Sequence, residues 1–363
     1  MMDNGIGNGP SAKKQASERR MLRVGTRLTA DAYSPNGVLV LCAGGVIENE
    51  SQLLSLRRHH VRLGLREHGG EDSLEPEERP RTSDPRAKEL EANIRRASCV
   101  RSEAVRQVSS VFERIETSGK VDVRAMQDAV SGLVKELLSD RLALASLVQL
   151  KDADSYTFTH SVNVAILAMY LAMNAQFEED LEQIGTGAIL HDIGKVRTPL
   201  SVLRKKGPLT EIERRVIQRH PQHGVDLLLE SGFADAVGLS CVLDHHEKLS
   251  GGGYPHGKRA TELSPYAKIT GLADIYDAMT TPRPYRNAMT AQEALLTMSH
   301  EMAMDLDPWL LERFIAAVGH LTERTTVTPE GEVLPRFVAE SEEEAPEPVV
   351  EVEHSMPRID TQA

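Results

Sequence analysis

Seven side chains able to bind metal ions are spread through one stretch of the chain, and they constrain its fold more than any other feature. The set comprises His160, the adjacent pair His191 and Asp192, then His220, the adjacent pair His245 and His246, and Asp274. Because each cation takes roughly four to six donors, seven ligands suffice for more than one cation. The fold must therefore bring residues that are far apart in sequence to one point.

The stretch that carries these ligands is expected to be helical. Apolar residues recur at helical spacing in six segments between 162 and 298. We expect His191 and Asp192 near the end of a helix that begins around Glu178 and stops at Gly194. Adjacent helical residues diverge by about 100°, so both reach one site only if it lies between them, which suits a carboxylate that bridges two cations. Asp274 is expected in mid-helix, where a buried carboxylate needs a cation as partner.

Composition divides the rest of the chain and sets the predicted fold class. We predict a mainly α protein: a helical bundle with a small N-terminal β-rich (α/β) module and disordered termini. An Asn-Gly pair at 36–37 between apolar runs predicts a hairpin in that module. The predicted units are disordered residues 1–20, the module at 21–66, a solvated linker at 67–86, a helical connector at 87–148, the main domain at 149–321 and an acidic disordered tail at 322–363. The connector helices could also pair with a second copy of the chain, as a homodimer.

Charge and aromatic content limit the partners. The formal net charge is −12, and the chain has only six Phe, seven Tyr and one Trp, which argues against a nucleic acid polymer as partner. A small phosphate ligand remains compatible, because local charge decides there. The polar N-terminus has no apolar signal segment, and the longest apolar run, 162–175, is too short to span a bilayer. We expect a cytoplasmic protein without a membrane partner.

Several motifs in order resemble the HD-GYP family, a branch of the HD metal-dependent phosphohydrolases. The resemblance covers about 150–310. Its motifs are His160-Ser161, the run His191-Asp192-Ile193-Gly194-Lys195, His220-Pro221, His245-His246-Glu247, Gly253-Tyr254-Pro255, the run from Ala273 to Thr280 and Arg283-Pro284-Tyr285-Arg286.

The resemblance implies an all-α bundle that hydrolyses cyclic di-GMP to pGpG, to GMP or to both, with water activated between two divalent metal ions. One cation would be held by His160, His191, Asp192 and Asp274, and Asp192 would bridge to a second cation held by His220, His245 and His246. Family members use iron or manganese, which nitrogen and oxygen ligands without thiolate also suit. Tyr156 stands where some members carry a Glu for a third metal, so we expect two.

The same resemblance assigns substrate contacts, and each has a plainer alternative. Lys195 could reach the scissile phosphate or pair with a nearby carboxylate. Arg283 and Arg286 could grip phosphate oxygens or form surface salt bridges. Asp277 could contact Lys195 or a water.

The Gly253, Tyr254 and Pro255 loop could cover the metals or meet a partner, such as a diguanylate cyclase with a GGDEF domain or another signalling protein. Ser250 stands where relatives carry an acidic or amide residue. Two other functions stay open. The first is a receptor that binds cyclic di-GMP and signals through protein contacts. The second is another HD-type phosphohydrolase that acts on nucleoside phosphates or on 3′,3′-cyclic GMP-AMP. The complete set of seven ligands favours the enzyme.

Overall fold

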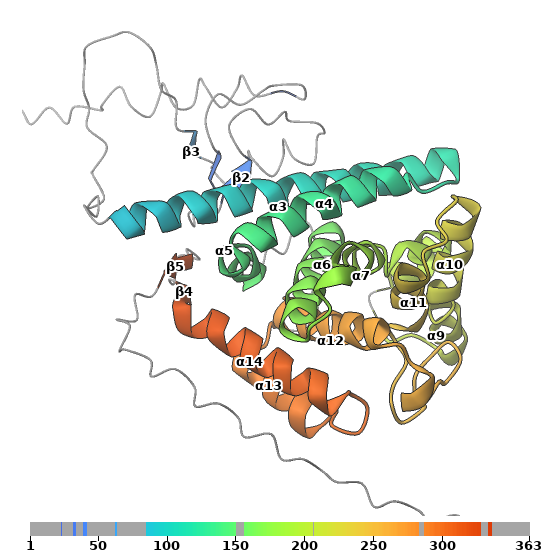
Figure 1. Cartoon of the computed structure of the whole chain (residues 1–363). Coiled ribbons are helices and arrows are strands. Elements are labelled where there is room, and N and C mark those ends of the chain that lie inside the picture. Colours follow the sequence, from blue (N-terminus) through green and yellow to red (C-terminus); the bar gives the residue numbers. More distant parts are fainter. Residues whose placement is uncertain are drawn as a thin grey trace, which may run out of the picture.

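The computed structural model describes residues 23, 32–33, 39–41, 62–63, 85–149, 156–205, 207–282, 287–327 and 333–335. Within these ranges the protein is mainly helical, as predicted for its class (Figure 1). The longer helices are α3 (Pro85–Ser118), α4 (Val123–Ser139), α6 (Tyr156–Asn174), α7 (Leu181–Ile189), α10 (His220–Glu230), α11 (Ala236–Asp244), α12 (Pro265–Thr280), α13 (Ala291–His300) and α14 (Pro308–Arg324). Shorter helices are α5 (Arg141–Ser146), α8 (Leu200–Leu203) and α9 (Glu211–Ile217), with 3-10 turns η1 (Leu147–Gln149), η2 (Glu178–Asp180), η3 (Ile193–Arg197) and η4 (Ala260–Glu262).

Helix α6 forms the centre of the bundle. Every residue from 159 to 172 is buried, as expected for a helix that is apolar on nearly all sides. It packs against α7, α12, α3 and α14. Buried apolar side chains from these helices join one core that extends to α10 and α11. The first metal-ligand candidate, His160, therefore projects from the most enclosed element of the fold.

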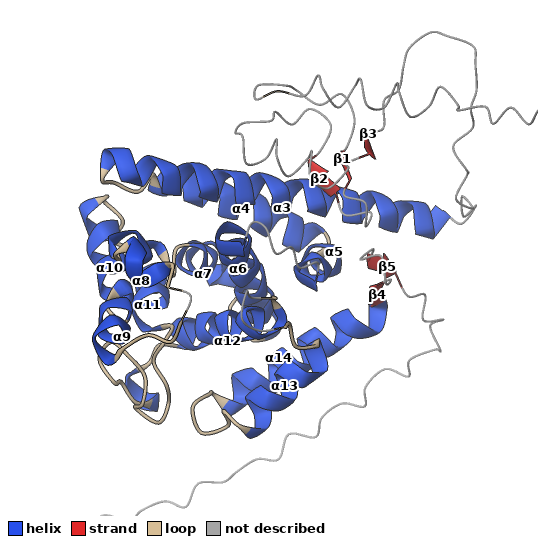
Figure 2. Cartoon of the chain, turned by 180° about the vertical axis from the view of Figure 1, so that it is seen from behind, coloured by secondary structure: helices blue, strands red, loops and turns tan. Residues whose placement is uncertain are grey.

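The predicted connector consists of α3 and α4, which lie side by side along one edge of the bundle (Figures 1 and 2). The apolar spacing used to predict α4 is confirmed, because Met126, Val130, Leu133 and Leu137 are all fully buried. Asp122 begins this helix by accepting a hydrogen bond from the Ala125 amide at 3.1 Å. Helix α3 also contacts α6 and η3, so the connector is part of the same core as the ligand-bearing helices.

Short strands lie at the margins of the helical body (Figure 2). Strands β1 (Ala32–Tyr33), β2 (Leu39–Leu41) and β3 (Arg62–Leu63) form an antiparallel sheet in the order β2-β1-β3, with Ala32 opposite Leu41 and Leu63. Strand β2 contacts α3. Near the other end of the chain, β4 (Thr325–Val327) pairs with β5 (Val333–Pro335).

Several of the predicted units lie largely outside the residues that the structure describes. The disordered segment 1–20, most of the module at 21–66, nearly all of the linker at 67–86 and most of the tail at 322–363 lie outside the described residues, so they stay predictions. Helix α3 begins two residues before the predicted connector, and α14 ends two residues after the predicted start of the tail, at Arg324. No helix in the described part of the chain is both long enough and apolar enough to cross a bilayer.

Candidate metal centre

The seven predicted ligands converge from five places in the bundle. His160 lies on α6, His220 is the first residue of α10, His245 follows the last residue of α11 with His246 next to it, and Asp274 lies in the middle of α12. His191 and Asp192 do not lie within a helix, and that prediction is wrong: α7 ends at Ile189, and the pair occupies the turn before η3. The turn frees both side chains to reach different neighbours, which adjacent positions on a helix would hinder.

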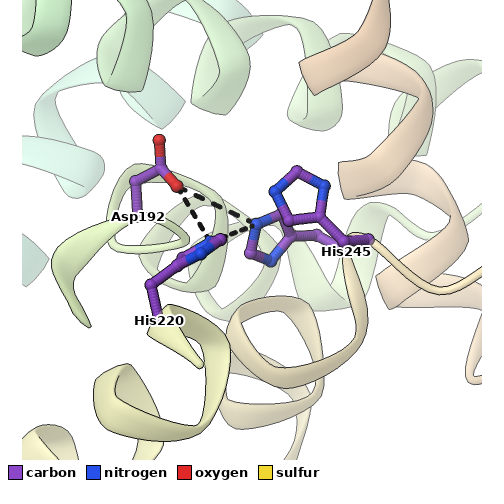
Figure 3. Close-up of side chains that lie close together, drawn as sticks. Asp192, His220 and His245 are labelled. Atoms are coloured by element: carbon purple, nitrogen blue, oxygen red, sulfur yellow. Dashed lines mark hydrogen bonds and ion pairs between the residues drawn. The ribbon is translucent and has the colours of Figure 1, made fainter. Parts of the chain in front are cut away.

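One cluster is formed by His160, His191 and Asp274, which are all buried. The Oδ1 atom of Asp274 lies 3.1 Å from Nε2 of His160 and 3.9 Å from Nε2 of His191. The second cluster is formed by Asp192, His220, His245 and His246. In it, Oδ1 of Asp192 lies 3.2 Å from Nε2 of His220 and 4.0 Å from Nε2 of His245 (Figure 3).

The two clusters meet at Asp192 and Asp274. The Oδ2 atom of Asp192 lies 3.4 Å from Nε2 of His191 in the first cluster, while its Oδ1 faces the second. Asp274 reaches the other way, with Oδ2 3.8 Å from Nδ1 of His246. A carboxylate with one oxygen in each cluster has the geometry that the sequence predicted for a bridging ligand. The two clusters divide the six other ligands as the family resemblance implied, and Asp192 is grouped with the second cluster while its Oδ2 reaches His191 in the first.

Backbone carbonyls fix the tautomers of three of these histidines. The Nδ1 atoms of His191, His220 and His245 lie 2.7, 2.8 and 2.9 Å from the carbonyl oxygens of Ala188, Ile217 and Val242. A carbonyl only accepts, so each Nδ1 donates its proton. In the neutral rings, each Nε2 then carries a lone pair and points into the clusters.

The resulting contacts bring acceptors together. Nε2 of His220 lies 3.3 Å from Nε2 of His245 and 3.2 Å from Oδ1 of Asp192, with no proton available between neutral rings. Within the described residues, Nε2 of His191 and Oδ1 of Asp192 are buried without a hydrogen-bond partner. Ligand atoms about 2.1 Å from one cation lie about 3.0–3.4 Å apart at right or tetrahedral angles. The spacing of these acceptor atoms therefore matches the spacing of ligand atoms around a metal ion.

Electrostatics keep the main ligands in their binding forms. Burial raises the pKa of the Asp192 carboxyl, but its neighbours, with the Lys195 ammonium foremost, outweigh burial and hold it well below its usual range. Burial also lowers the pKa of His246 to about 3 and holds that of His245 well below its ordinary value. At neutral pH the carboxylate is thus ionised and these two imidazoles are neutral, as cation binding requires.

His160 differs from the other histidines because two carboxylates flank it. Burial lowers its pKa, but hydrogen bonds with Asp274 and Asp277 outweigh burial and raise the pKa to about 9. Its Nδ1 lies 2.7 Å from Oδ2 of Asp277, and its Nε2 faces Asp274. A cation at this cluster would displace the proton from Nε2 and leave Nδ1 donating to Asp277.

Gly194 permits the approach that joins Asp192 to His220. A Cβ atom at this position would lie 2.0 Å from the carbonyl oxygen of His220 and 2.4 Å from the amide nitrogen of Gly224. The start of η3 is thus in backbone contact with the first turn of α10. A glycine is required at position 194, because no side chain fits between η3 and α10.

The predicted loop folds over His246. A Cβ on Gly253 would lie 2.4 Å from the Cα of Glu247, so this loop backbone touches the turn that carries the His pair. The Tyr254 amide donates to the His246 carbonyl at 3.2 Å, and the two ring centroids are 4.7 Å apart. Pro255 follows through a cis peptide bond. This geometry supports the first of the two predicted roles for the loop, covering the metal centre.

Two carboxylates, Glu247 and Asp305, hold the loop in place. Glu247 accepts hydrogen bonds from the amides of His256 at 2.7 Å and Lys258 at 3.0 Å. Ser250, the departure from the family pattern, donates to Asp305 at 2.6 Å. The hydroxyl thus ties the loop to the segment between α13 and α14, and no predicted ligand depends on it.

The predicted substrate contacts have mixed outcomes. The Lys195 ammonium contacts Oδ2 of Asp192, which is the pairing given as its alternative, and its side chain is 34 % exposed at the edge of the clusters. Asp277 does not lie where it could meet substrate or Lys195: it is fully buried and engages His160, Asn163 and Thr281. Its substrate role is therefore replaced by a role in holding His160. Arg283 and Arg286 lie outside the described residues.

Comparison with known proteins agrees with this geometry. Residues 133–310 match the family model described as HD domain. This part of the chain is therefore similar to the HD domain family. A solved structure described as an HDG"Y"P protein from Bdellovibrio bacteriovorus has a similar fold. Its TM-score is 0.54 at 17 % identity, over 82 % of this chain and 97 % of that one.

Relatives of known function share more of the sequence. The chain is 36 % identical to a cyclic di-GMP phosphodiesterase of Pseudomonas aeruginosa, over 63 % of this chain and 56 % of that protein. It is 35 % identical to 3′3′-cGAMP-specific phosphodiesterase 1 of Vibrio cholerae, over 47 % and 39 % of the two chains. It is 31 % identical to a cyclic di-GMP phosphodiesterase response regulator of Xanthomonas campestris, over 63 % and 60 %. The chain thus spans between about two fifths and three fifths of the length of these relatives.

Proposed function

We propose that this HD domain protein is a metal-dependent phosphodiesterase that hydrolyses cyclic di-GMP. The observation that carries the proposal is the pair of buried clusters joined by Asp192. In the second cluster, the Nε2 lone pair of neutral His220 faces Nε2 of His245 and Oδ1 of Asp192. Relatives that are 36 % and 31 % identical to this chain are named as cyclic di-GMP phosphodiesterases, which supports the choice of substrate.

We assign two divalent cations to the centre, one per cluster, with iron or manganese favoured because the ligands are imidazole and carboxylate without thiolate. His160, His191 and Asp274 would hold one cation, and His220, His245 and His246 the other, with Asp192 shared. Cations there would act as Lewis acids on the phosphate and would lower the pKa of a bound water to near neutrality.

The surrounding side chains would bind and orient the substrate. Lys195 lies at the edge of the centre, so its ammonium can leave Asp192 for a phosphate oxygen once a cation neutralises that carboxylate. Arg283 and Arg286 follow α12 closely in sequence, and we propose that their guanidinium groups grip the phosphates from that side. Tyr254 over His246 would shield the centre from bulk water. We propose GMP, pGpG or both as products.

Partners and location follow the same proposal. A cyclic dinucleotide made and consumed inside the cell places the protein in the cytoplasm, where it would meet a GGDEF diguanylate cyclase or another signalling protein. The long α3 and α4 pair offers a surface for a homodimer. Sedimentation that gives a strict monomer at micromolar concentration would exclude the homodimer.

The decisive experiment is hydrolysis of cyclic di-GMP by protein loaded anaerobically with Fe²⁺ or Mn²⁺. Asp192→Ala removes the shared ligand, and Asp122→Ala, which removes the distant cap of α4, serves as a matched carboxylate control. We expect turnover in the wild type and in Asp122→Ala, and its loss in Asp192→Ala. Turnover that is equal in all three proteins, or absent from a fully loaded wild type, would contradict the proposal.

A second substrate has its own support. Three relatives, 30–35 % identical, are named 3′3′-cGAMP-specific phosphodiesterases, so 3′,3′-cyclic GMP-AMP belongs in the same assay. Preference for that substrate at equal metal loading would reassign the specificity and keep the reaction class. Tight binding of cyclic di-GMP without turnover would instead support the receptor that the sequence left open.

A further inference from the structure

A chain of hydrogen bonds, buried near the metal centre and partly buried at its outer end, reaches from the centre to the surface helix α3. It begins at His160, whose Nδ1 lies 2.7 Å from Oδ2 of Asp277. The other oxygen of Asp277 accepts from the side-chain amide of Asn163 at 3.1 Å. The amide oxygen of Asn163 in turn accepts from Arg101, at 3.2 Å from Nε and 2.9 Å from Nη2. These four residues, His160, Asp277, Asn163 and Arg101, are called the relay below.

The direction of each hydrogen bond in the relay is fixed by its ends. The Arg101 guanidinium only donates, so Asn163 must present its oxygen there. The Asp277 carboxylate only accepts, so the amide nitrogen of Asn163 must face it, and Nδ1 of His160 must donate to its other oxygen. An asparagine flipped by 180° would place like groups together at both contacts. The relay therefore has one arrangement that satisfies every member.

Burial gives this arrangement its strength. Asp277 is fully buried, and Asn163, on α6, is 1 % exposed. Polar groups in such a setting are costly when unpaired, and hydrogen bonds in series polarise one another. Asn163 lies three residues after His160, so both face the same side of α6. Loss of Arg101 would leave the Asn163 oxygen without the charged donor that orients the whole series.

Arg101 belongs to a part of the chain that the HD domain match does not include. It lies on α3, and the match begins at residue 133, within α4. Helix α3 also contacts strand β2 from the N-terminal region (Figure 1). The relay thus connects a metal-ligand candidate with a helix that precedes the catalytic unit in sequence.

We propose that Arg101 and Asn163 are positioning residues for His160, so that the seating of α3 against α6 sets the cation affinity of the cluster formed by His160, His191 and Asp274. This rests on the metal centre of the proposed function. Through Asp277, the relay holds the His160 ring in one tautomer and one orientation, with Nε2 aimed at Asp274. A shift of α3 would release Asn163, then Asp277, and allow the ring to turn away.

Manganese binding measured by electron paramagnetic resonance on chelator-treated protein tests the inference without any turnover. Arg101→Ala is compared with Arg96→Ala, a matched control on the same helix. The Arg96 guanidinium ties α3 to Glu136 on α4 at 2.9 Å and has no link to the metal centre. Thermal unfolding of the metal-free proteins gives the purely structural effect of each change.

We expect Arg101→Ala to weaken one of two Mn²⁺ sites by about 10–100-fold, as loss of an outer hydrogen-bond partner does at metal sites. His160→Ala identifies that site by abolishing it. Arg96→Ala should lower thermal stability and leave both affinities unchanged. In an Asn163→Leu background, Arg101→Ala should cause no further loss of affinity, because the connection is already broken. Arg101→Lys, which keeps the charge and loses the forked contact, should be intermediate and serves if the alanine variant does not fold.

Three results would overturn the inference. The first is equal Mn²⁺ affinity in Arg101→Ala and Arg96→Ala at matched stability. The second is an additive loss in the double variant. The third is a wild type that binds no Mn²⁺ at a site sensitive to His160→Ala. A protein that binds both cations with the expected dependence on Arg101, yet does not hydrolyse a cyclic dinucleotide, would refute the proposed function and leave this inference standing.

Discussion

Substitution of Gly194 by alanine tests whether backbone contact between η3 and α10 builds the metal centre. The added Cβ would lie 2.0 Å from the His220 carbonyl oxygen and 2.4 Å from the Gly224 nitrogen, whereas real Cβ atoms essentially never come within 3.0 Å. Because both obstacles are backbone atoms, no side-chain rotation can relieve the overlap. The two elements must separate by about 1 Å even to reach the tightest contact seen in proteins.

Two effects of different size follow. Overpacking in a close-packed core costs about 1–3 kcal/mol, and a rigid obstacle favours the upper end. In addition, the 3.2 Å between Oδ1 of Asp192 and Nε2 of His220 would grow to about 4 Å, too long for two ligands that meet one cation at a right or tetrahedral angle. We therefore expect the free energy of unfolding to fall by about 3 kcal/mol and Mn²⁺ affinity to fall by at least about 10-fold.

Urea denaturation of metal-free protein and Mn²⁺ titration measure the two effects separately. Gly207→Ala is the matched control, because Gly207 is exposed and has no heavy atom within 4 Å of an added Cβ. It should change the free energy of unfolding by less than about 0.5 kcal/mol. The reasoning is refuted if Gly194→Ala behaves as Gly207→Ala does in both measurements.

Three further outcomes are expected. Leu133 on α4 is fully buried, so Leu133→Ala should lower the free energy of unfolding by about 2–5 kcal/mol. Leu138 on the same helix is 61 % exposed, so Leu138→Ala should change the free energy of unfolding little. Equal urea midpoints for the two variants would contradict the assigned core. Mn²⁺ at about 100 times its dissociation constant should stabilise the wild type by about 2.7 kcal/mol, and neither Mn²⁺ nor its removal by chelator should shift the melting temperature of Asp192→Ala. Burial raises the pKa of Cys241 to about 12, so at pH 8.5 its thiol stays protonated and should resist iodoacetamide in native protein but react in urea, as peptide mass spectrometry would show.

Residue type and spacing predicted the helical class and a metal centre built from the seven ligands, and the family resemblance implied how those ligands divide into two sets. The turn at His191 and Asp192 was not predicted, since the apolar spacing of α7 continues to Leu190 and Ile193 and gives no sign that the helix ends at Ile189. A tertiary contact explains why the helix ends there: the backbone of Gly194 packs on α10, which a continued helix could not reach.

The assignment of Asp277 shows what a motif cannot supply. The sequence placed it in the same run as Asp274, and on a helix positions three apart share a face. The structure turns Asp274 into the clusters and buries Asp277 against Asn163 and the far side of His160. One signal was present: Asn163 interrupts an apolar run three residues after His160, and a polar residue there needs a partner. Which carboxylate it would meet depended on how α12 packs against α6.

The facing lone pairs of His220, His245 and Asp192 mean that this end of the metal-free molecule is locally frustrated: its packing is good while its electrostatics oppose it. Apolar residues of similar volume would make the metal-free protein more stable, so the chain gives up stability in order to hold ligands arranged for a cation. The surplus that tolerates this comes from the opposite character of α6, buried and apolar along most of its length. The buried apolar packing of α6 thus offsets the electrostatic strain at the metal centre, and the protein reaches its most stable state only in a cell that can supply it with metal.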